Sequence, residues 1–138
     1  MWKFYALLSA LFAALTAIFT KLGVRNVDSD LATAIRTAVV LALTWGIVLV
    51  SGKMQSVKTV GAGTWTFLIL SGVATGLSWL FYFKALQTGD VSKVAPLDKL
   101  SVVFTIILAV IILKEPLTFK VALGAVLITC GAIVLIWK

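Results

Sequence analysis

The most constraining feature of this sequence is a series of long apolar runs separated by short polar connectors. A membrane-spanning helix needs about 17–25 consecutive residues that are mainly apolar. Five segments of the 138-residue chain meet this requirement: 3–22, 31–51, 64–86, 92–113 and 118–137. We therefore expect an all-α, polytopic membrane protein in which residues 1–138 form one domain, a bundle of five transmembrane helices.

The composition supports a lipid environment. The chain is 62% hydrophobic and 12% charged, whereas a soluble domain is about half apolar and about a quarter charged. The first apolar run resembles a signal peptide, but it extends from Phe4 to Thr20. That is longer than the roughly 7–15 residues of a signal-peptide core, and four further apolar runs follow. We interpret it as the first spanning helix.

The polar connectors carry helix start and stop signals. Asp28 offers an N-cap for the second span, and Thr118 offers one for the fifth. Pro96 lies in the first turns of the fourth span, where a missing N–H group is tolerated. Glu115-Pro116 ends that span, because a residue before proline disfavours helical geometry.

Several classes of function are disfavoured. The net charge of +7 comes from residues that punctuate apolar runs, so we expect no nucleic-acid partner. The chain has no histidine and a single cysteine, Cys130, so we expect no metal and no cofactor. No Ser-His or Cys-His arrangement can exist without histidine, and we therefore expect no enzyme activity.

The distribution of basic residues gives almost no preferred orientation in the membrane. With five spans, one face carries the N-terminal amine and Lys3, Lys53, Lys58, Lys114 and Lys120. The other face carries Lys21, Arg25, Lys84, Lys93, Lys99 and Lys138. The positive-inside rule thus finds six basic groups on each face. Either a feature outside this balance fixes the topology, or copies insert in both directions and form an antiparallel pair.

Four of the five spans carry a stripe of polar side chains on one helical face. At about 100° per residue, the stripe of the second span includes Thr37, with Arg36 at its flank. The other stripes include Ser71, Thr75, Ser78 and Tyr82 on the third span, and Asp98, Ser101 and Thr105 on the fourth. We expect these faces to line a substrate pathway. The alternative is that the hydroxyl groups only bond to their own backbone or mediate helix packing.

Charged groups within spans are costly and mark candidate functional sites. Asp98 is the one carboxylate clearly inside a span, with Lys99 beside it. It is a candidate for substrate or proton contact, or it forms a structural ion pair with Lys99, Lys84 or Arg36. Arg36 either contributes to the pathway or extends to the near membrane interface. Trp79 lies deep in the third span and either lines a cavity or packs.

Small residues mark two faces for close helix contact. Gly72 and Gly76 form a GxxxG step on the third span, and Gly124 and Gly131 share a face of the fifth. Glycine lets helix backbones approach closely within a membrane. These positions are predicted packing or dimer contacts.

The stretch from Phe83 to Leu135 resembles a known family. An Ala-Leu pair, Gly89-Asp90, a Val-Ala-Pro-Leu string, an apolar helix, Glu115 and a glycine-containing apolar helix follow one another. This order resembles the EamA domain of the drug/metabolite transporter superfamily, whose repeat has the size of this chain. Typical members carry two such repeats in opposite orientations and export metabolites or drugs. With one repeat, the resemblance implies a dimer.

The resemblance also differs from the small multidrug members of the superfamily, which use a glutamate within the first helix for proton-coupled antiport. The first span here has no acid. Proton-coupled efflux of organic cations is therefore not implied, unless Asp98 serves instead.

These observations predict a half-size secondary transporter, an exporter of small metabolites or drugs that works by alternating access. Its expected partners are the lipid bilayer, a small-molecule substrate, and a second copy in antiparallel orientation or another half-size chain. Its expected location is the cytoplasmic membrane of a prokaryote. The alternatives are a flippase subunit for a lipid-linked group, and a membrane subunit or assembly factor that does not transport.

Of the two alternatives that the charge balance leaves open, insertion in both directions predicts that both orientations coexist. Single cysteines at Gly63 and Lys138, in a Cys130→Ala background, lie on opposite faces by five-span counting. We expect an impermeant thiol reagent to label each site in about half of the molecules in intact cells, because neither face is favoured. Labelling at only one of the two sites means a single topology and excludes the antiparallel homodimer.

Overall fold

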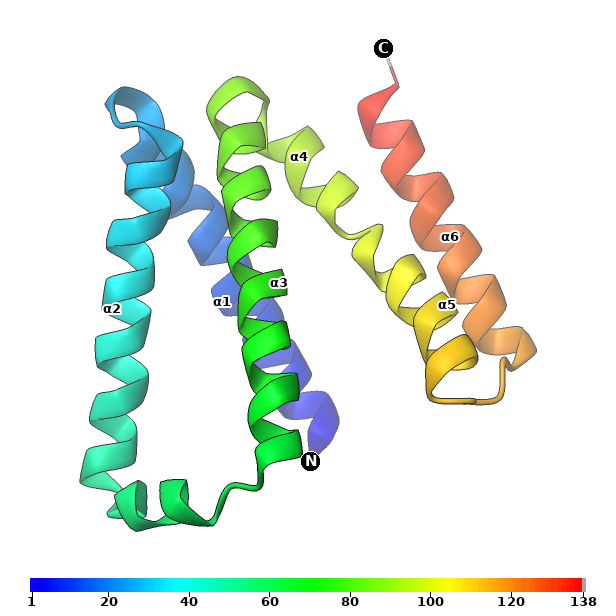
Figure 1. Ribbon diagram of the computed structural model, residues 1–138. Helices are drawn as coiled ribbons and strands as arrows, with labels where there is room; N and C mark the ends of the chain where they lie inside the picture. Colours follow the sequence, from blue (N-terminus) through cyan, green and yellow to red (C-terminus); the bar gives the residue numbers. More distant parts are fainter. Residues whose placement is uncertain (138) are drawn as a thin grey trace. The chain divides into compact units, whose positions relative to one another are not determined.

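The computed structural model describes residues 1–137, with the side chain of Arg25 left aside, and every regular element in that range is helical (Figure 1). Lys138 and the Arg25 side chain, which both enter the charge balance, lie outside the described part. The α-helices are α1 (Trp2–Gly23), α2 (Ser29–Val50), α3 (Ala62–Thr88), α4 (Val91–Asp98), α5 (Ser101–Ile112) and α6 (Phe119–Ile136). Two short 3₁₀ helices, η1 (Val24–Asn26) and η2 (Lys53–Thr59), lie in the connectors.

The five predicted spans are confirmed. Within the described residues, five segments are long and apolar enough to cross a membrane, and α4 and α5 together make the fourth, Val91–Ile112. The chain itself buries at most 11% of the apolar window of any span. Because water cannot cover so much apolar surface, lipid or another protein chain must cover it. The protein is an integral membrane protein.

The predicted helix caps are also present. The Asp28 carboxylate accepts hydrogen bonds from the backbone N–H groups of Asp30 and Leu31, at 2.9 and 3.2 Å. The Thr118 hydroxyl accepts one from the N–H of Val121 at 3.4 Å. Each cap satisfies donors that have no partner within the first turn of a helix.

The fourth span differs from the prediction of one continuous helix over 92–113. It divides at Lys99 and Leu100, between α4 and α5. Pro96 has no N–H group, and its ring crowds the carbonyl four residues earlier. Past this point, the N–H of Lys99 bonds to the carbonyl of Pro96 at 3.1 Å, and that of Leu100 bonds to Leu97 at 3.0 Å. These bonds span three residues instead of four, which tightens the helix and interrupts it.

The fourth span ends at Ile112, close to the predicted stop at Glu115-Pro116. Lys114 has a φ of 55°, in the left-handed region. A residue in that conformation leaves the helical path, so the chain turns before the proline is reached.

The contacts divide the chain into two compact units. The hairpin unit is Thr20–Gln87, and the split unit combines Met1–Phe19 with Thr88–Lys138. Helix α1 begins in the split unit and ends in the hairpin unit. A single five-helix domain requires these units to assemble in the membrane, and it stays a prediction.

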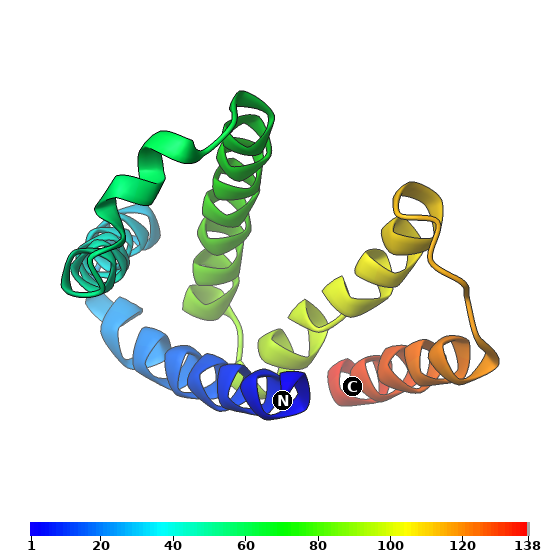
Figure 2. The ribbon, with the colours of Figure 1, turned by 90° about the horizontal axis from the view of Figure 1, so that it is seen from below.

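In the hairpin unit, α2 and α3 run in opposite directions and η2 joins them (Figures 1 and 2). The buried side chains gather at the opposite end, where α1 ends, α2 begins and α3 ends; they are Thr20, Val24, Ser29, Thr33, Phe83 and Leu86. Long-range hydrogen bonds from Gln87 and Lys21 tie this end together. The Gln87 amide donates to the carbonyl of Val27 at 2.9 Å, and the Lys21 ammonium donates to that of Leu86 at 2.6 Å.

In the split unit, α6 packs mainly along α4 and less along α5. Figure 2 shows α6 close to α4 at its C-terminal end and diverging from α5 toward the loop that joins them. Ala132 of α6 is buried, with 4% of its surface exposed. A small side chain at this position permits the close approach of the helices.

The burial pattern predicts which leucines of α3 hold the hairpin unit together. Leu86 is 0% exposed, whereas Leu70 on the same helix is 59% exposed. We expect Leu86→Ala to lower the free energy of unfolding by about 2–4 kcal/mol, because it leaves a cavity in a packed site. Leu70→Ala is the matched control and should cost well under half as much, because lipid fills the space. Titration with a denaturing detergent measures both, and equal losses contradict the described core.

Candidate functional site

The guanidinium of Arg36 lies against two aromatic rings of α3. Its central carbon is 4.3 Å from the ring centre of Trp79 and 5.0 Å from that of Phe83. Trp79 and Phe83 are four residues apart, so they lie on one face of α3, one turn from each other. Arg36 is half-buried and Phe83 is fully buried. We call these three residues the arginine clamp.

The clamp holds Arg36 inside the span and not at its surface. At 1.5 Å per residue, Arg36 lies about 10 Å from the start of α2, Phe83 about 8 Å from the end of α3, and Trp79 about 14 Å from that end. The start of α2 and the end of α3 lie at the same end of the hairpin unit. Because the guanidinium contacts Trp79, the deeper ring, more closely than Phe83, its side chain extends sideways to α3. Whether Arg36 contributes to a pathway or reaches the near membrane interface stays a prediction.

Among the described residues, the guanidinium of Arg36 has no counter-ion. Among the residues that the structure describes, the ion pairs are Lys93–Asp90 and Lys99–Asp98, and Arg36 takes part in neither. No hydrogen bond of its guanidinium to a described group is formed either. Every buried side-chain nitrogen or oxygen in the described residues has a hydrogen-bond partner. Since the N–H groups of Arg36 have no such partner, they are accessible from the surroundings. The clamp therefore contacts the guanidinium through two rings, and no described group accepts a hydrogen bond from its N–H donors.

Tyr82 completes the aromatic face of α3 at this level. Its ring centre lies 6.4 Å from that of Phe83, with the rings tilted by 48°. The tyrosine is half-buried. It brings a phenol group next to the clamp on an otherwise apolar turn.

The threonine hydroxyls of the predicted stripes bond to their own helices. Thr37 donates to the carbonyl of Thr33, Thr75 to Ser71 and Thr105 to Ser101, each at 2.8 Å. This is the local bonding that the sequence left as an alternative, and it lets these faces meet lipid without an unmade donor bond. It does not remove the oxygen lone pairs. A stripe of such groups presents hydrogen-bond acceptors.

The serines of the stripes lie on exposed helix surfaces. Ser71 and Ser78 are exposed on α3, and Ser101 is exposed at the start of α5. They therefore stand where a substrate or a second chain can reach them. Their assignment to a pathway stays a prediction.

Asp98 and Lys99 lie at the interruption of the fourth span. Their side chains form an ion pair, with Lys99 Nζ and Asp98 Oδ2 3.6 Å apart. Of the partners considered for Asp98, this geometry selects Lys99. The Asp98 side chain is 37% exposed and that of Lys99 is 58% exposed, so both remain accessible to a ligand. The predicted pathway residues thus form two groups, one in each unit.

The predicted packing glycines are open within the chain. A methyl group added at Gly72, Gly76, Gly124 or Gly131 meets no atom within 4 Å. These glycines therefore do not provide close contacts inside either unit. Their surfaces remain free for another chain, and the dimer contact stays a prediction.

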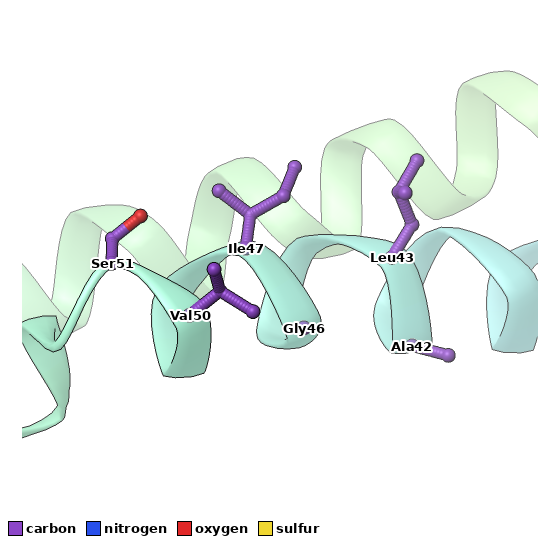
Figure 3. A pocket seen from close by; sticks show the side chains of 6 residues that line it. All are labelled: Ala42, Leu43, Gly46, Ile47, Val50 and Ser51. Atoms are coloured by element: carbon purple, nitrogen blue, oxygen red, sulfur yellow. The ribbon is translucent and has the colours of Figure 1, made fainter.

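A shallow apolar hollow lies on the second half of α2 (Figure 3). Its volume is about 440 Å³, and it is lined by residues of α2 and its C-cap: Ala42, Leu43, Gly46, Ile47, Val50 and Ser51. Gly46 and Ala42 leave space between larger apolar side chains. Because one helix provides all of its walls, the hollow is a surface depression and not an enclosed substrate site.

Sequence reasoning included Arg36 and Trp79 but missed Phe83. The available signal was the four-residue spacing of Trp79 and Phe83 on a helix that returns next to α2. The hydroxyl periodicity of α3 indicated the neighbouring Tyr82 instead. An aromatic residue in an apolar span is common, so only the structure distinguishes the one that contacts the guanidinium.

Comparison with known proteins gives two kinds of match. The profile of the EamA-like transporter family matches residues 1–137. A Sinorhizobium protein named as an uncharacterized transporter in the cobO 3' region is 52% identical over 134 residues, which cover 97% of this chain and 95% of the relative. An uncharacterized protein of Methanocaldococcus jannaschii is 37% identical over 70 residues, 51% of each chain. No solved structure matches.

The clamp geometry predicts an energetic coupling between Arg36 and Trp79. We expect a double-mutant cycle of Arg36→Gln and Trp79→Leu to give a coupling energy of about 1 kcal/mol, within the range of cation–π contacts. Unfolding of the purified protein in detergent provides the four free energies. The matched control pairs Arg36→Gln with Trp65→Leu, near the start of α3. A coupling no larger than in that control contradicts the clamp.

Proposed function

Because the chain belongs to the EamA-like transporter family, we propose that this membrane transporter is a half-size secondary carrier that exports small metabolites or drugs. Two copies in antiparallel orientation form the working unit. Together they supply the ten spans and the inverted symmetry that many carriers contain in one chain. The observation that carries the proposal is the family match over 1–137 to a chain with five spans.

The size of the relatives supports a one-repeat transporter. This chain aligns with 95% of the length of the Sinorhizobium relative, so one repeat accounts for nearly all of that relative. That relative is named as an uncharacterized transporter. The balanced basic residues of this sequence favour two orientations in one membrane, which an antiparallel pair requires.

The polar faces support a pathway for a solute. The threonine oxygens on α2, α3 and α5 present acceptors while their protons are bonded locally. Arg36 provides an uncompensated positive charge, and the Asp98–Lys99 pair provides a neutral but polar contact. Charged groups within spans are expensive, and they are found mainly where they face an interior or an aqueous cavity.

The interruption of the fourth span supports alternating access. The two short helices on either side of Lys99 and Leu100 are held by bonds over three residues, and such interruptions are tolerated at membrane depth where they line protein or water. Interrupted helices also occur at the substrate sites of many carriers. In this mechanism the two copies rock about the axis between them and expose the site to one face at a time.

Solute counterflow tests the carrier function. We expect purified protein in liposomes loaded with a metabolite pool to accumulate a labelled member of that pool transiently, because a carrier exchanges solutes without an external energy source. Empty liposomes provide the control. If no solute moves under any gradient while a second membrane protein co-purifies, the chain is a subunit of another complex and the carrier proposal fails.

A tandem fusion tests the antiparallel pair. Five spans place the chain ends on opposite faces, so a direct fusion of two copies forces the second copy into the opposite orientation. We expect this fusion to retain counterflow. A fusion with one extra spanning helix between the copies forces parallel orientation and should lose counterflow, because the inverted symmetry is lost. Activity in the parallel fusion alone overturns the antiparallel arrangement.

A further inference from the structure

We propose that the arginine clamp of Arg36, Trp79 and Phe83 is the binding site for the carboxylate group of a small organic monoanion. This inference rests on the proposed carrier function and deepens it by naming the chemical class of the substrate. It concerns one unit of the chain, since all three residues belong to the hairpin unit.

The first argument is the missing counter-ion. A guanidinium within a span is costly, and proteins usually reduce that cost by pairing the charge. No described carboxylate pairs with Arg36. The charge is nevertheless held about 10 Å from the start of its helix by two ring contacts. A ligand anion supplies the absent partner.

The second argument is the geometry that the clamp leaves open. A guanidinium is planar, and its faces stack on aromatic rings while its edges carry the N–H donors. The two ring centres lie 4.3 and 5.0 Å from the central carbon, and no described group occupies the N–H donors. The open edge matches a carboxylate, which accepts two parallel hydrogen bonds from such a fork.

The third argument concerns charge balance and favours a carboxylate over a phosphate. Arg36 brings one positive charge, which one carboxylate neutralises. A phosphate monoester carries nearly two negative charges at neutral pH, and the second charge would remain uncompensated at membrane depth, where an unpaired charge is costly. The apolar body of the ligand lies against the aromatic face of α3.

The surrounding hydroxyls refine the ligand class. Thr33 and Thr37 flank Arg36 on α2, and both donate their protons to backbone carbonyls of their own helix at 2.8 Å. Their oxygens can only accept further bonds. The exposed one, Thr37, suits a ligand that carries an N–H or O–H group next to its carboxylate.

Ligand-dependent thermal stability of the full chain in detergent tests this site. The probes are benzoate, its neutral isostere benzamide, and phenylphosphonate. We expect wild-type protein to be stabilised by benzoate with an apparent dissociation constant at least tenfold lower than that for benzamide, because ligand binding to the folded state shifts unfolding in proportion to affinity. Tighter binding of phenylphosphonate than of benzoate overturns the carboxylate assignment in favour of a phosphate group. No preference for either anion overturns the site.

Variants locate the effect at the clamp. We expect Arg36→Gln to remove the tenfold preference for benzoate, and Lys58→Gln in η2, which removes the same charge outside the spans, to preserve it. Should Arg36→Gln fail to fold, Arg36→Lys retains the charge and tests the planar fork. It should weaken benzoate binding several-fold, since a lysine cannot form the bidentate pair. Unchanged benzoate binding in either folded arginine variant overturns the proposal.

Counterflow separates this inference from the carrier function. If Arg36-dependent benzoate binding is found without counterflow of any solute, the site stands and the carrier function fails. If counterflow of neutral or cationic solutes proceeds equally in wild type and Arg36→Gln, the carrier function stands and the carboxylate site fails.

Discussion

Every backbone polar group that enters the hydrocarbon core must find a partner within the protein, and the whole structure depends on this constraint. Each N–H or C=O group left without a bond in lipid costs several kcal/mol. Helices satisfy these groups locally, which explains why all regular elements of the described chain are helical. The threonine hydroxyls follow the same rule, because they bond to carbonyls four residues earlier. The hairpin unit follows it as well, since Lys21 donates to a carbonyl of α3 and Gln87 donates to a carbonyl in the connector between α1 and α2.

The exceptions to this constraint mark the chemistry. At Pro96 the helical bond is unavailable, and the fourth span is interrupted next to the Asp98–Lys99 pair. At Arg36 a full charge lies within a span, with rings but no carboxylate as its protein contacts. Neither an interrupted helix nor an unpaired charge stabilises a chain with so little polar surface. Both therefore indicate a functional role. Both lie on faces that carry hydroxyl groups, which is consistent with a route for a polar solute.

The apolar surface explains why one copy is not the complete functional unit in our proposal. No span buries more than 11% of its apolar window within the chain, and a methyl group added at the glycines of α3 and α6 would meet no atom of another helix within 4 Å. Lipid covers any apolar surface equally well, but it does not enclose a polar path. A second copy supplies both a wall for such a path and a neighbour for the glycines.

The sequence by itself determined the spans, their caps and the family, because these depend on local properties. Hydropathy over about twenty residues defines a membrane helix, and Asp28 and Thr118 cap helices through bonds to residues two or three positions away. The tertiary structure alone decided that Phe83 and Trp79 hold Arg36 inside the span, that Leu86 is the most buried side chain at that end, and that Asp98 pairs with Lys99. The ring contacts of Arg36 join residues more than forty positions apart, and the burial of Leu86 depends on which face of α3 turns toward α2. An apolar sequence leaves that choice open, since every face of such a helix is acceptable to lipid, and only packing between helices selects one.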